Sequence, residues 1–526
     1  MTLRPSPLIL AIDLGTSGAK VGLVSRGGHV VASSFERTRL KLLPGGGAEQ
    51  DPDDWWRAVT TAARRVVATA GPPRSVAAVA CTGQWSGTVP VDAAGRHLGP
   101  ALIWMDARGA RLVARTVHGP VRVKGYDVRK LLRWVRLTGG APERSGKDPV
   151  AHILWIANNR PAIYDAAVAF LEPKDYLNAR LTGRLAAGFD SIALHWVTDN
   201  RRVDRVRYDP RLIAMVGLDV DKLPPLRPPT DVLGALQPQA AEELGLLPGT
   251  PVVMGAPDMH AAAVGSGATA DYQAHLYLGT SSWLLCHVPY KKTDIAHNLA
   301  SLPSSLPGRW LVVNEQETAG AALTFLARNL RLPAEGVAAD AGLTEMYAGY
   351  DRMAEHTPPG SSGVLFTPWL YGERTPVEHA TLRGSFVNLS LDTTRRDMVR
   401  AVLEGVALNT RWLLAHVERF IGRRIDAIRI VGGGAASRTW CQIHADALDR
   451  TLHQVAAPEL VSLRGAALLG FLSLGVIGID EIGGDTETTE TFRPGPASTA
   501  VYDRLFREFL RQYRSSRGMH DRLVGD

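Results

Sequence analysis

The sequence predicts an α/β protein of two domains that flank a central cleft. Three observations predict this fold: the length of 526 residues, the alternation of short apolar strands with helices, and a glycine-rich turn that occurs in both halves. One hydrophobic core usually supports about half this length, and alternating strands and helices are typical of α/β domains. We expect one domain over residues 1–256, a second over 257–485, and a linker with a C-terminal helix packed on the core over 486–526.

The first predicted element is a strand hairpin. A short apolar run over residues 8–12 leads into the turn Gly15-Thr16-Ser17-Gly18, and a second apolar segment over 20–24 follows at once. Short continuous apolar runs are typical of buried strands. A P-loop or a Rossmann turn would open a helix instead, and neither GxxxxGK[ST] nor a GxGxxG motif after a strand occurs in the sequence.

Capping and turn residues predict the elements that follow. A helix is expected from Asp51 to about Thr69, because Asp51 offers an N-cap acceptor and Pro52 suits the first helical position. A buried strand over 76–80 leads into the turn Gly83-Gln84-Trp85-Ser86-Gly87. The later elements are a strand over 252–254, the turn 255–258, a small-residue helix over 259–265, a long amphipathic helix over 397–420, a strand over 425–431 and a closing helix over about 499–514.

The tetrapeptide Leu-Gly-Thr-Ser occurs twice, at residues 14–17 and 278–281. The two copies are 264 residues apart in a chain of 526, and both end a predicted buried strand. An ancient duplication with one copy in each domain explains this spacing. A chance similarity of two strand-to-turn segments is the alternative.

Composition excludes several classes of protein. The net charge is +7, but the arginines are scattered without a basic tail, so we expect no nucleic-acid partner. No apolar run approaches the roughly 20 residues of a membrane span, and we expect no membrane anchor. The three cysteines are widely spaced and odd in number, which suits the reducing cytoplasm.

Three glycine-rich turns are candidates for binding phosphate: residues 15–18, 279–282 and 432–434. Glycine lets backbone N–H groups approach an anion, and the hydroxyls of Thr and Ser add donors. Each turn alone is more often an ordinary turn. Together, two such turns that face each other across a cleft favour a nucleotide.

Two carboxylates lie beside these turns. Asp13 ends the first strand, where it is placed to hold Mg²⁺. Asp258 precedes a helix near the expected hinge, where a carboxylate can accept the proton of a hydroxyl that attacks a γ-phosphoryl group. A helix cap is the alternative role for Asp258.

The residues resemble the FGGY carbohydrate kinases of the actin-like ATPase fold, most closely the xylulokinases. The resemblance covers roughly 450 residues. The segments that carry it are Ile12-Asp13-Leu14-Gly15-Thr16-Ser17-Gly18, Gly372-Glu373-Arg374-Thr375-Pro376, and residues 49–52, 83–84, 102–108, 171–177, 278–281, 401–406 and 432–437. The family's fold implies two RNase H-like domains around a deep cleft.

The resemblance also implies the site. It makes Asp258 the catalytic base, with Asp13 and Asp258 on the side of a Mg²⁺ ion. The residues implied for ATP are Gly15, Thr16, Ser17, Lys20, Gly279, Thr280, Ser281, Gly433, Gly434, Ala435 and Ser437. The residues implied for the sugar are Gln84, Trp85, Ser86, Asp106, Arg108 and Met259.

The sequence departs from the xylulokinase pattern where the sugar should bind. Xylulokinases usually follow Gly-Gln with Met-His-Gly, but here Trp85 and Ser86 occupy those positions, and Met259 replaces the usual Asn after the catalytic Asp. A pocket that reads hydroxyls by hydrogen bonds discriminates strongly through such groups. The Trp85 indole is expected either to stack on the substrate or to fill the floor of the cleft.

We therefore expect an ATP- and Mg²⁺-dependent kinase that converts D-xylulose to D-xylulose 5-phosphate. The alternative within the family is another ketose, alditol or aldonate, such as ribulose, erythritol or gluconate. A remote alternative is an ATPase switch of the actin or chaperone type. A small-molecule substrate is the expected partner, and the sequence leaves a homodimer open.

Overall fold

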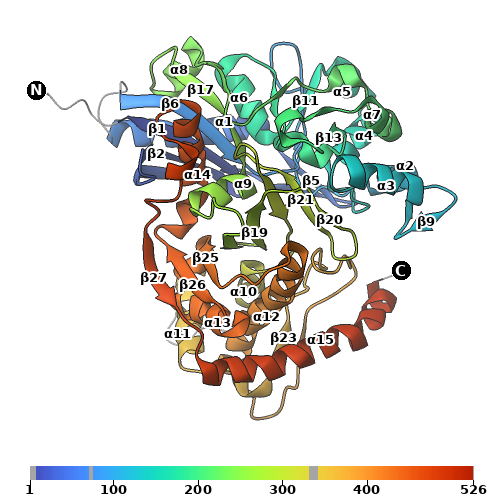
Figure 1. The fold of residues 1–526 in the computed structure, drawn as a ribbon, viewed down its shortest axis with the longest axis vertical. Coiled ribbons are helices and arrows are strands. Elements are labelled where there is room, and N and C mark those ends of the chain that lie inside the picture. Colours follow the sequence, from blue (N-terminus) through green and yellow to red (C-terminus); the bar gives the residue numbers. More distant parts are fainter. Residues whose placement is uncertain (1–6, 70–74, 331–341, 525–526) are drawn as a thin grey trace, which may run out of the picture.

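The computed structural model describes residues 7–69, 75–330 and 342–524. The fold contains two large mixed sheets, one above the other in the view of Figure 1. The strands of the N-terminal sheet, in spatial order, are β16 (Val232–Ala235), β17 (Pro251–Pro257), β6 (Val76–Gly83), β1 (Leu8–Gly15), β2 (Gly18–Ser25) and β3 (Val30–Arg37). The C-terminal sheet has the order β20 (Thr293–Asp294), β21 (Leu299–Pro303), β22 (Trp310–Val313), β19 (Ser282–Val288), β18 (Ala274–Leu278), β25 (Ala427–Val431), β26 (Thr451–Val455) and β27 (Thr488–Phe492).

The two sheets share one topology. β1 pairs antiparallel with β2 and parallel with β6, and β18 likewise pairs antiparallel with β19 and parallel with β25. The outer strands match as well. β17 runs parallel to β6 and antiparallel to β16, and in the same way β26 runs parallel to β25 and antiparallel to β27. The predicted hairpin is confirmed, and the repeated topology agrees with the duplication predicted from the Leu-Gly-Thr-Ser repeat.

Helices cover both sheets. α1 (Pro52–Thr69) packs on β2 and β3 through an apolar face that includes Trp55 and Val59. α12 (Arg395–Ile421) lies against α13 (Arg438–Leu448) in the other lobe, and its N-terminus is closed by a capping box between Thr394 and Asp397. Both helices begin within two residues of the expected position, because the capping residues Asp51 and Thr394 fix where each can start.

Two helices cross between the sheets. α9 (Asp258–Gly265) and α14 (Val461–Ser473) meet where Gly265 and Gly465 face each other's backbone, so that no side chain fits at either position. One face of α9 packs with α14 and the N-terminal sheet, and the other packs on the C-terminal sheet. Figure 1 shows α14 beside β1 and β6, two strands from the opposite end of the sequence. We keep the limits 1–256 and 257–485 as a proposal for the domains, with α14 packing back on the first.

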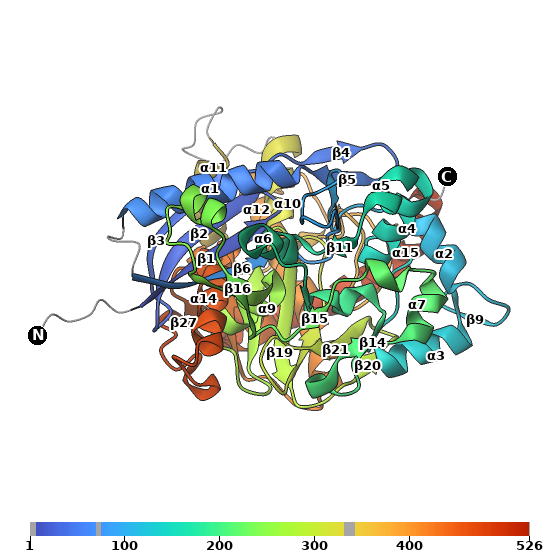
Figure 2. The ribbon, with the colours of Figure 1, turned by 90° about the horizontal axis from the view of Figure 1, so that it is seen from above.

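The last segment differs from the expectation in one detail. The prediction of a polar linker over residues 486–496 is wrong, because β27 lies in this segment and pairs with β26. The closing helix α15 (Pro496–Val524) is longer than expected and crosses the C-terminal lobe, where Tyr502 and Phe509 are fully buried. Figure 2 shows that the end of α15 lies on the side of the molecule that carries α2 (Ala110–Val117) and α4 (Pro149–Asn159).

Candidate active site

The carboxyl ends of three parallel strands meet at one edge of the N-terminal sheet. In the register of β1, β6 and β17, Asp13 lies opposite Thr82, and Gly83 lies between Leu14 and Pro257. Ligands of open α/β sheets bind at the carboxyl ends of the strands. The topology therefore brings Asp13, the turn that begins at Gln84, and Asp258 to the same edge.

Asp13 is buried and belongs to the β1–β2 hairpin, where its cross-strand partner is Lys20. Lys20 Nζ lies 3.9 Å from Asp13 Oδ2 and donates to the carbonyl oxygen of Glu459 at 3.1 Å. Burial raises the pKa of Asp13, and the positive charge of Lys20 opposes that rise. The predicted nucleotide residue Lys20 thus sits next to the predicted metal residue Asp13, at a contact between the two lobes.

Asp258 is the first residue of α9, and its Oδ1 accepts a hydrogen bond of 2.8 Å from the backbone N–H of Met259. Burial, followed by the negative charge of Asp13, raises the pKa of Asp258 to about 8. The strand that leads to it is held by two buried donors, because Lys174 Nζ and Asn178 Nδ2 both bond the carbonyl oxygen of Met254. A carboxyl group with this pKa, on a rigid strand end, is suited to take up a proton near neutral pH.

The first glycine-rich turn is tied to its surroundings by polar contacts. The Thr16 hydroxyl donates to Gln84 Oε1 at 3.2 Å and accepts from Trp104 Nε1 at 2.9 Å. Gln50 Nε2 donates to the Thr16 carbonyl at 2.9 Å, while Ser17 is exposed. These contacts fix the turn, so that its backbone is organised before a ligand arrives.

The second turn lies at the equivalent edge of the C-terminal sheet. Gly279 N–H bonds the Ser281 carbonyl at 3.0 Å, and the Thr280 carbonyl accepts from the backbone N–H groups of Ala319 and Ala321 at the start of α10 (Gly320–Phe325). Ser281 is buried and contacts the side chain of Glu315. The turn therefore forms one unit with the residues that precede α10.

The triple-glycine turn follows β25, the strand next to β18. Gly432 has a φ of 90°, and a Cβ atom there would lie 2.7 Å from the Leu278 carbonyl oxygen. Gly433 has open space around it. Ala435 is buried, and the Ser437 hydroxyl caps α13 through Trp440 N–H at 3.0 Å while donating to Asp351 at 2.6 Å. Gly433 is thus the one predicted adenosine residue whose surroundings leave room for a ligand.

The predicted sugar residues occupy different environments. Trp85 is 6% exposed, and its indole N–H bonds the Ser191 carbonyl at 2.8 Å while its ring meets His260 edge-on. The structure thus favours the cleft-floor role for Trp85 over stacking. Ser86 has a φ of 65° and donates to the Lys147 carbonyl at 2.8 Å. Met259 is partly buried against the apolar groups of both lobes.

Asp106 and Arg108 bond to each other. Asp106 is 0% exposed, accepts from the Ala48 N–H at 2.9 Å, and forms a two-point ion pair with Arg108. Arg108 also bonds Glu49 at 2.7 Å and lies over the ring of Trp155. The prediction that Asp106 contacts the sugar is not supported, because its oxygens are already engaged. The pair instead supports the loop beside the site.

A charged cluster between the lobes was missed in the sequence. Arg374 pairs with Glu315 at 2.9 Å and with Glu317 at 3.0 Å, and Lys147 Nζ lies 3.5 Å from Glu317. Arg374 also lies 3.7 Å from Glu143, so the cluster joins the two lobes. The charge of Glu315 contributes to the raised pKa of Asp258, which places the cluster close to the predicted base.

Weak signals for this cluster exist in the sequence. Arg374 belongs to the Gly-Glu-Arg-Thr-Pro segment that carries the family resemblance, but no role was assigned to it. Glu315 and Glu317 lie two and four residues after the end of β22, and Lys147 follows Gly146 without forming a P-loop. Acidic residues after a strand were the signal that could have found this group.

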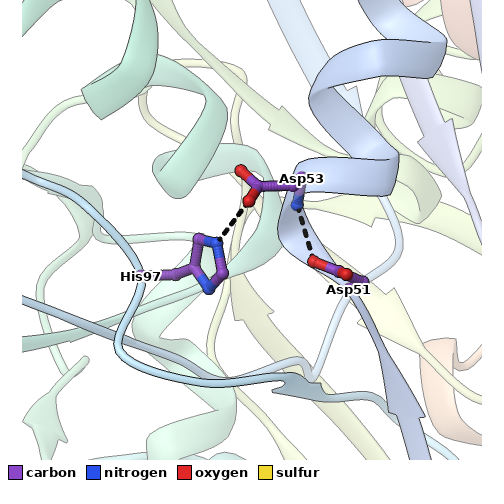
Figure 3. Close-up of side chains that lie close together, drawn as sticks. All are labelled: Asp51, Asp53 and His97. Carbon is purple, nitrogen blue, oxygen red and sulfur yellow. Dashed lines mark hydrogen bonds and ion pairs between the residues drawn. The ribbon is translucent and has the colours of Figure 1, made fainter.

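Asp51, Asp53 and His97 form the one group of three potential metal ligands found among the described residues (Figure 3). Asp51 uses its Oδ1 to accept the Asp53 N–H at 3.0 Å at the start of α1, and His97 Nε2 lies 3.2 Å from Asp53 Oδ2. Arg180 approaches Asp53 at 3.6 Å. These contacts account for the group as a helix cap with a partly exposed ion pair.

Two family models of known proteins match this chain, one over each lobe. The N-terminal domain of the FGGY family of carbohydrate kinases matches residues 8–265, and the family's C-terminal domain matches residues 274–474. The chain belongs to the FGGY family of carbohydrate kinases. It is therefore a sugar kinase with the actin-like ATPase fold, and FGGY kinases take ATP as the phosphoryl donor.

The relatives of this FGGY kinase differ in their substrates. A xylulose kinase of Staphylococcus epidermidis is 27% identical over 522 residues, which is 97% of each chain. A gluconokinase of Bacillus subtilis is 25% identical over 471 residues, covering 89% of this chain and 88% of its own. The crystal structure of a xyloylose kinase from Brucella ovis superposes with a TM-score of 0.83 at 27% identity, over 97% of this chain and 100% of that one.

The search for membrane spans found none: over the described residues, no helix combines the length and the apolar composition that crossing a bilayer requires.

Proposed function

We propose that this FGGY kinase transfers the γ-phosphoryl group of MgATP to a hydroxyl of a small neutral sugar or polyol, with D-xylulose as the first candidate and D-xylulose 5-phosphate as its product. One observation carries the proposal. Asp258, with a pKa raised to about 8, stands beside Asp13 at the carboxyl edge of the N-terminal sheet. The family supports phosphoryl transfer, and the xylulose kinase relatives support the sugar.

Asp258 acts as the general base in this mechanism. The substrate hydroxyl loses its proton to the Asp258 carboxylate as its oxygen bonds the γ-phosphorus, while the bond from that phosphorus to the β-γ bridging oxygen breaks and ADP leaves. The proton stays on Asp258 until the product departs. Contacts from Met259 N–H and the rigid β17 strand aim the carboxylate.

The residues at this edge suit Mg²⁺, because Asp13 and Asp258 offer the hard carboxylate oxygens that this ion prefers. The two carboxylates repel each other, and a bound cation would relieve that repulsion. When bound, Mg²⁺ would neutralise negative charge on the transferring phosphoryl group. Lys20, which lies 3.9 Å from Asp13, adds a positive charge on the same side.

Residues of both lobes would hold ATP. We assign the phosphates to the turns at Thr16-Ser17 and Thr280-Ser281, and the adenosine to the open space at Gly433. The fixed hydrogen bonds of the Thr16 turn and of the Thr280 turn support this assignment, since organised backbone N–H groups bind anions at little cost in entropy.

The charges around the site favour a neutral acceptor. Lys147 and Arg374 are the cations of the cluster between the lobes. Glu317 already pairs with both of them, and Glu315 pairs with Arg374. An aldonate carboxylate would have to displace one of these partners. A ketose or an alditol needs only hydrogen bonds to its hydroxyls.

A second candidate remains within the family. Ser86 and Met259 replace two polar groups of the xylulokinase pattern, and a gluconokinase is among the relatives. Ribulose, erythritol and gluconate therefore belong in the test. An ATPase switch has no support, since the family places the chain among carbohydrate kinases.

A substrate panel tests the proposal. ATP consumption by the purified protein is measured with D-xylulose, D-ribulose, erythritol, D-gluconate and no acceptor. We expect D-xylulose to give the highest kcat/KM and gluconate to give the lowest among the acceptors. Gluconate as the preferred acceptor would overturn the neutral-substrate argument, and ATP hydrolysis that no acceptor stimulates would overturn the kinase proposal.

A further inference from the structure

A surface hairpin carries a group of arginines that the kinase reaction does not use. Its strands are β13 (Thr198–Asp199) and β14 (Arg207–Tyr208). A cavity of about 370 Å³ opens beside it, a size within the range of small-molecule sites, roughly 300–1,000 Å³. The residues that line this arginine cavity are Asp199, Arg201, Arg202, Arg205 and Arg207.

The carboxylates nearby neutralise only part of the positive charge. Arg201 forms a two-point ion pair with Asp199, at 2.9 and 2.8 Å, and Arg202 forms one with Asp204, at 3.2 and 2.7 Å. Asp209 adds a third negative charge that acts on Arg201. Four guanidinium groups thus face three carboxylates, of which two form close ion pairs.

The other two arginines hold the unneutralised charge. Arg205 Nε lies 3.9 Å from Asp204, which is outside hydrogen-bond distance. Arg207 is exposed and has no ion pair with any carboxylate of the described chain. Both side chains therefore keep free N–H donors at the cavity.

The wall of the cavity is anchored to the body of the lobe. Asn200, in the loop of the hairpin, donates its backbone N–H to the Leu137 carbonyl at 2.8 Å and its side-chain amide to the Thr138 carbonyl at 3.0 Å. These carbonyls end α3 (Val128–Leu137). The arginines thus project from a fixed loop, and a planar guanidinium on a fixed backbone matches the oxygens of a phosphate group.

The end of α3 and the residues directly after it also contact the C-terminal lobe. Lys291 of the C-terminal lobe donates to the Val135 carbonyl at 2.6 Å, and Thr293 donates to the Gly139 carbonyl at 2.7 Å. We propose that the arginine cavity binds a small, multiply charged phosphorylated anion, at a site separate from that of the kinase reaction. A ligand there would contact the β13–β14 hairpin. This hairpin bonds the end of α3, which also bonds the C-terminal lobe.

Inorganic pyrophosphate is the probe for this site. Its binding to the full-length protein is measured by calorimetry without Mg²⁺ and with ADP in saturating excess, so that the nucleotide turns are occupied. We expect a binding event that persists under ADP and that the double variant Arg205→Ser/Arg207→Ser weakens by about tenfold or more. Arg511→Ser removes an equally exposed, paired arginine on α15 and should leave the affinity unchanged.

Three results would overturn the proposal. Pyrophosphate binding that ADP abolishes belongs to the nucleotide turns. An affinity that Arg205→Ser/Arg207→Ser leaves unchanged removes the cavity from consideration, and both side chains are exposed enough for this variant to fold. A short oligonucleotide that binds through the same two arginines more tightly than pyrophosphate would replace the small ligand by a nucleic acid.

Discussion

The two sheets present different chemistry at equivalent edges. In the N-terminal sheet, Asp13 lies near the end of β1 and Asp258 directly follows β17. In the C-terminal sheet, Tyr277 stands where the repeat would place Asp13 and stacks on Trp283 at 4.0 Å, while Ala456 directly follows β26. Both copies kept the hairpin and the Gly-Thr-Ser turn. We infer that both copies would bind phosphate through this turn, and that only the N-terminal copy would supply the carboxylates of the proposed reaction.

The strongest test of this division is Asp258→Asn. We expect kcat to fall by about 10²- to 10⁴-fold, because the amide cannot accept the hydroxyl proton, while the Kd for ATP stays within a few-fold. Steady-state kinetics and calorimetry measure the two effects. A variant that keeps more than a third of the wild-type kcat would show that the base lies elsewhere.

The second-largest loss of kcat is expected for Asp13→Asn. Losing this charge is expected to lower kcat by about 10²-fold and to raise the Mg²⁺ concentration needed for half-maximal activity. Tyr277→Phe changes the equivalent position of the other lobe and should alter kcat by less than about threefold, because no charge is removed there. Equal losses in the two variants would contradict the division between the lobes.

The pH profile gives a third test. Asp258 works as the carboxylate, so kcat/KM at low MgATP should rise about tenfold per pH unit up to its pKa of about 8 and then level off. Asp13→Asn removes the second cause of that raised pKa, and its profile should level off at lower pH. Profiles that coincide for the two proteins would show that Asp13 does not act on the titrating group.

The smallest expected effect concerns the glycines of the binding lobe. Gly432→Ala should lower the Tm by a few degrees, because a φ of 90° and the Leu278 carbonyl leave no room for a methyl group. Gly433→Ala has open space and should keep the Tm while raising the Kd for ATP several-fold. An unchanged Kd in Gly433→Ala would move the adenosine away from this turn.

Local signals in the chain were enough to predict most of the scaffold. The hairpin, the start of α1 and the strand ends at Asp13 and Asp258 follow from apolar runs, capping residues and glycine turns, all of which act over a few residues. The Leu-Gly-Thr-Ser repeat predicts related halves, and the six-strand order of the N-terminal sheet recurs in the C-terminal sheet, which β20 and β21 extend.

The features that could not be predicted depend on distant contacts. The cluster of Lys147, Glu317 and Arg374 joins loops that are far apart in sequence and meet only in the folded chain. The indole of Trp85 is buried in an apolar cluster, and its N–H is satisfied by a carbonyl 106 residues away, which no local pattern reveals. The sequence of β27 predicts a linker because an edge strand needs few apolar residues, and only Phe492 of its five residues is buried.

The crossing of α9 and α14 has a consequence for how the chain is made. The apolar face that β1 and β6 turn toward α14 is complete only after residue 473 has left the ribosome, which is 390 residues after the end of β6 and 458 after the end of β1. Until then Ile9, Ala11 and Ala80 have no cover from that helix. A nascent N-terminal half therefore emerges with an open apolar surface, and the two halves of this kinase complete their folding together rather than one after the other.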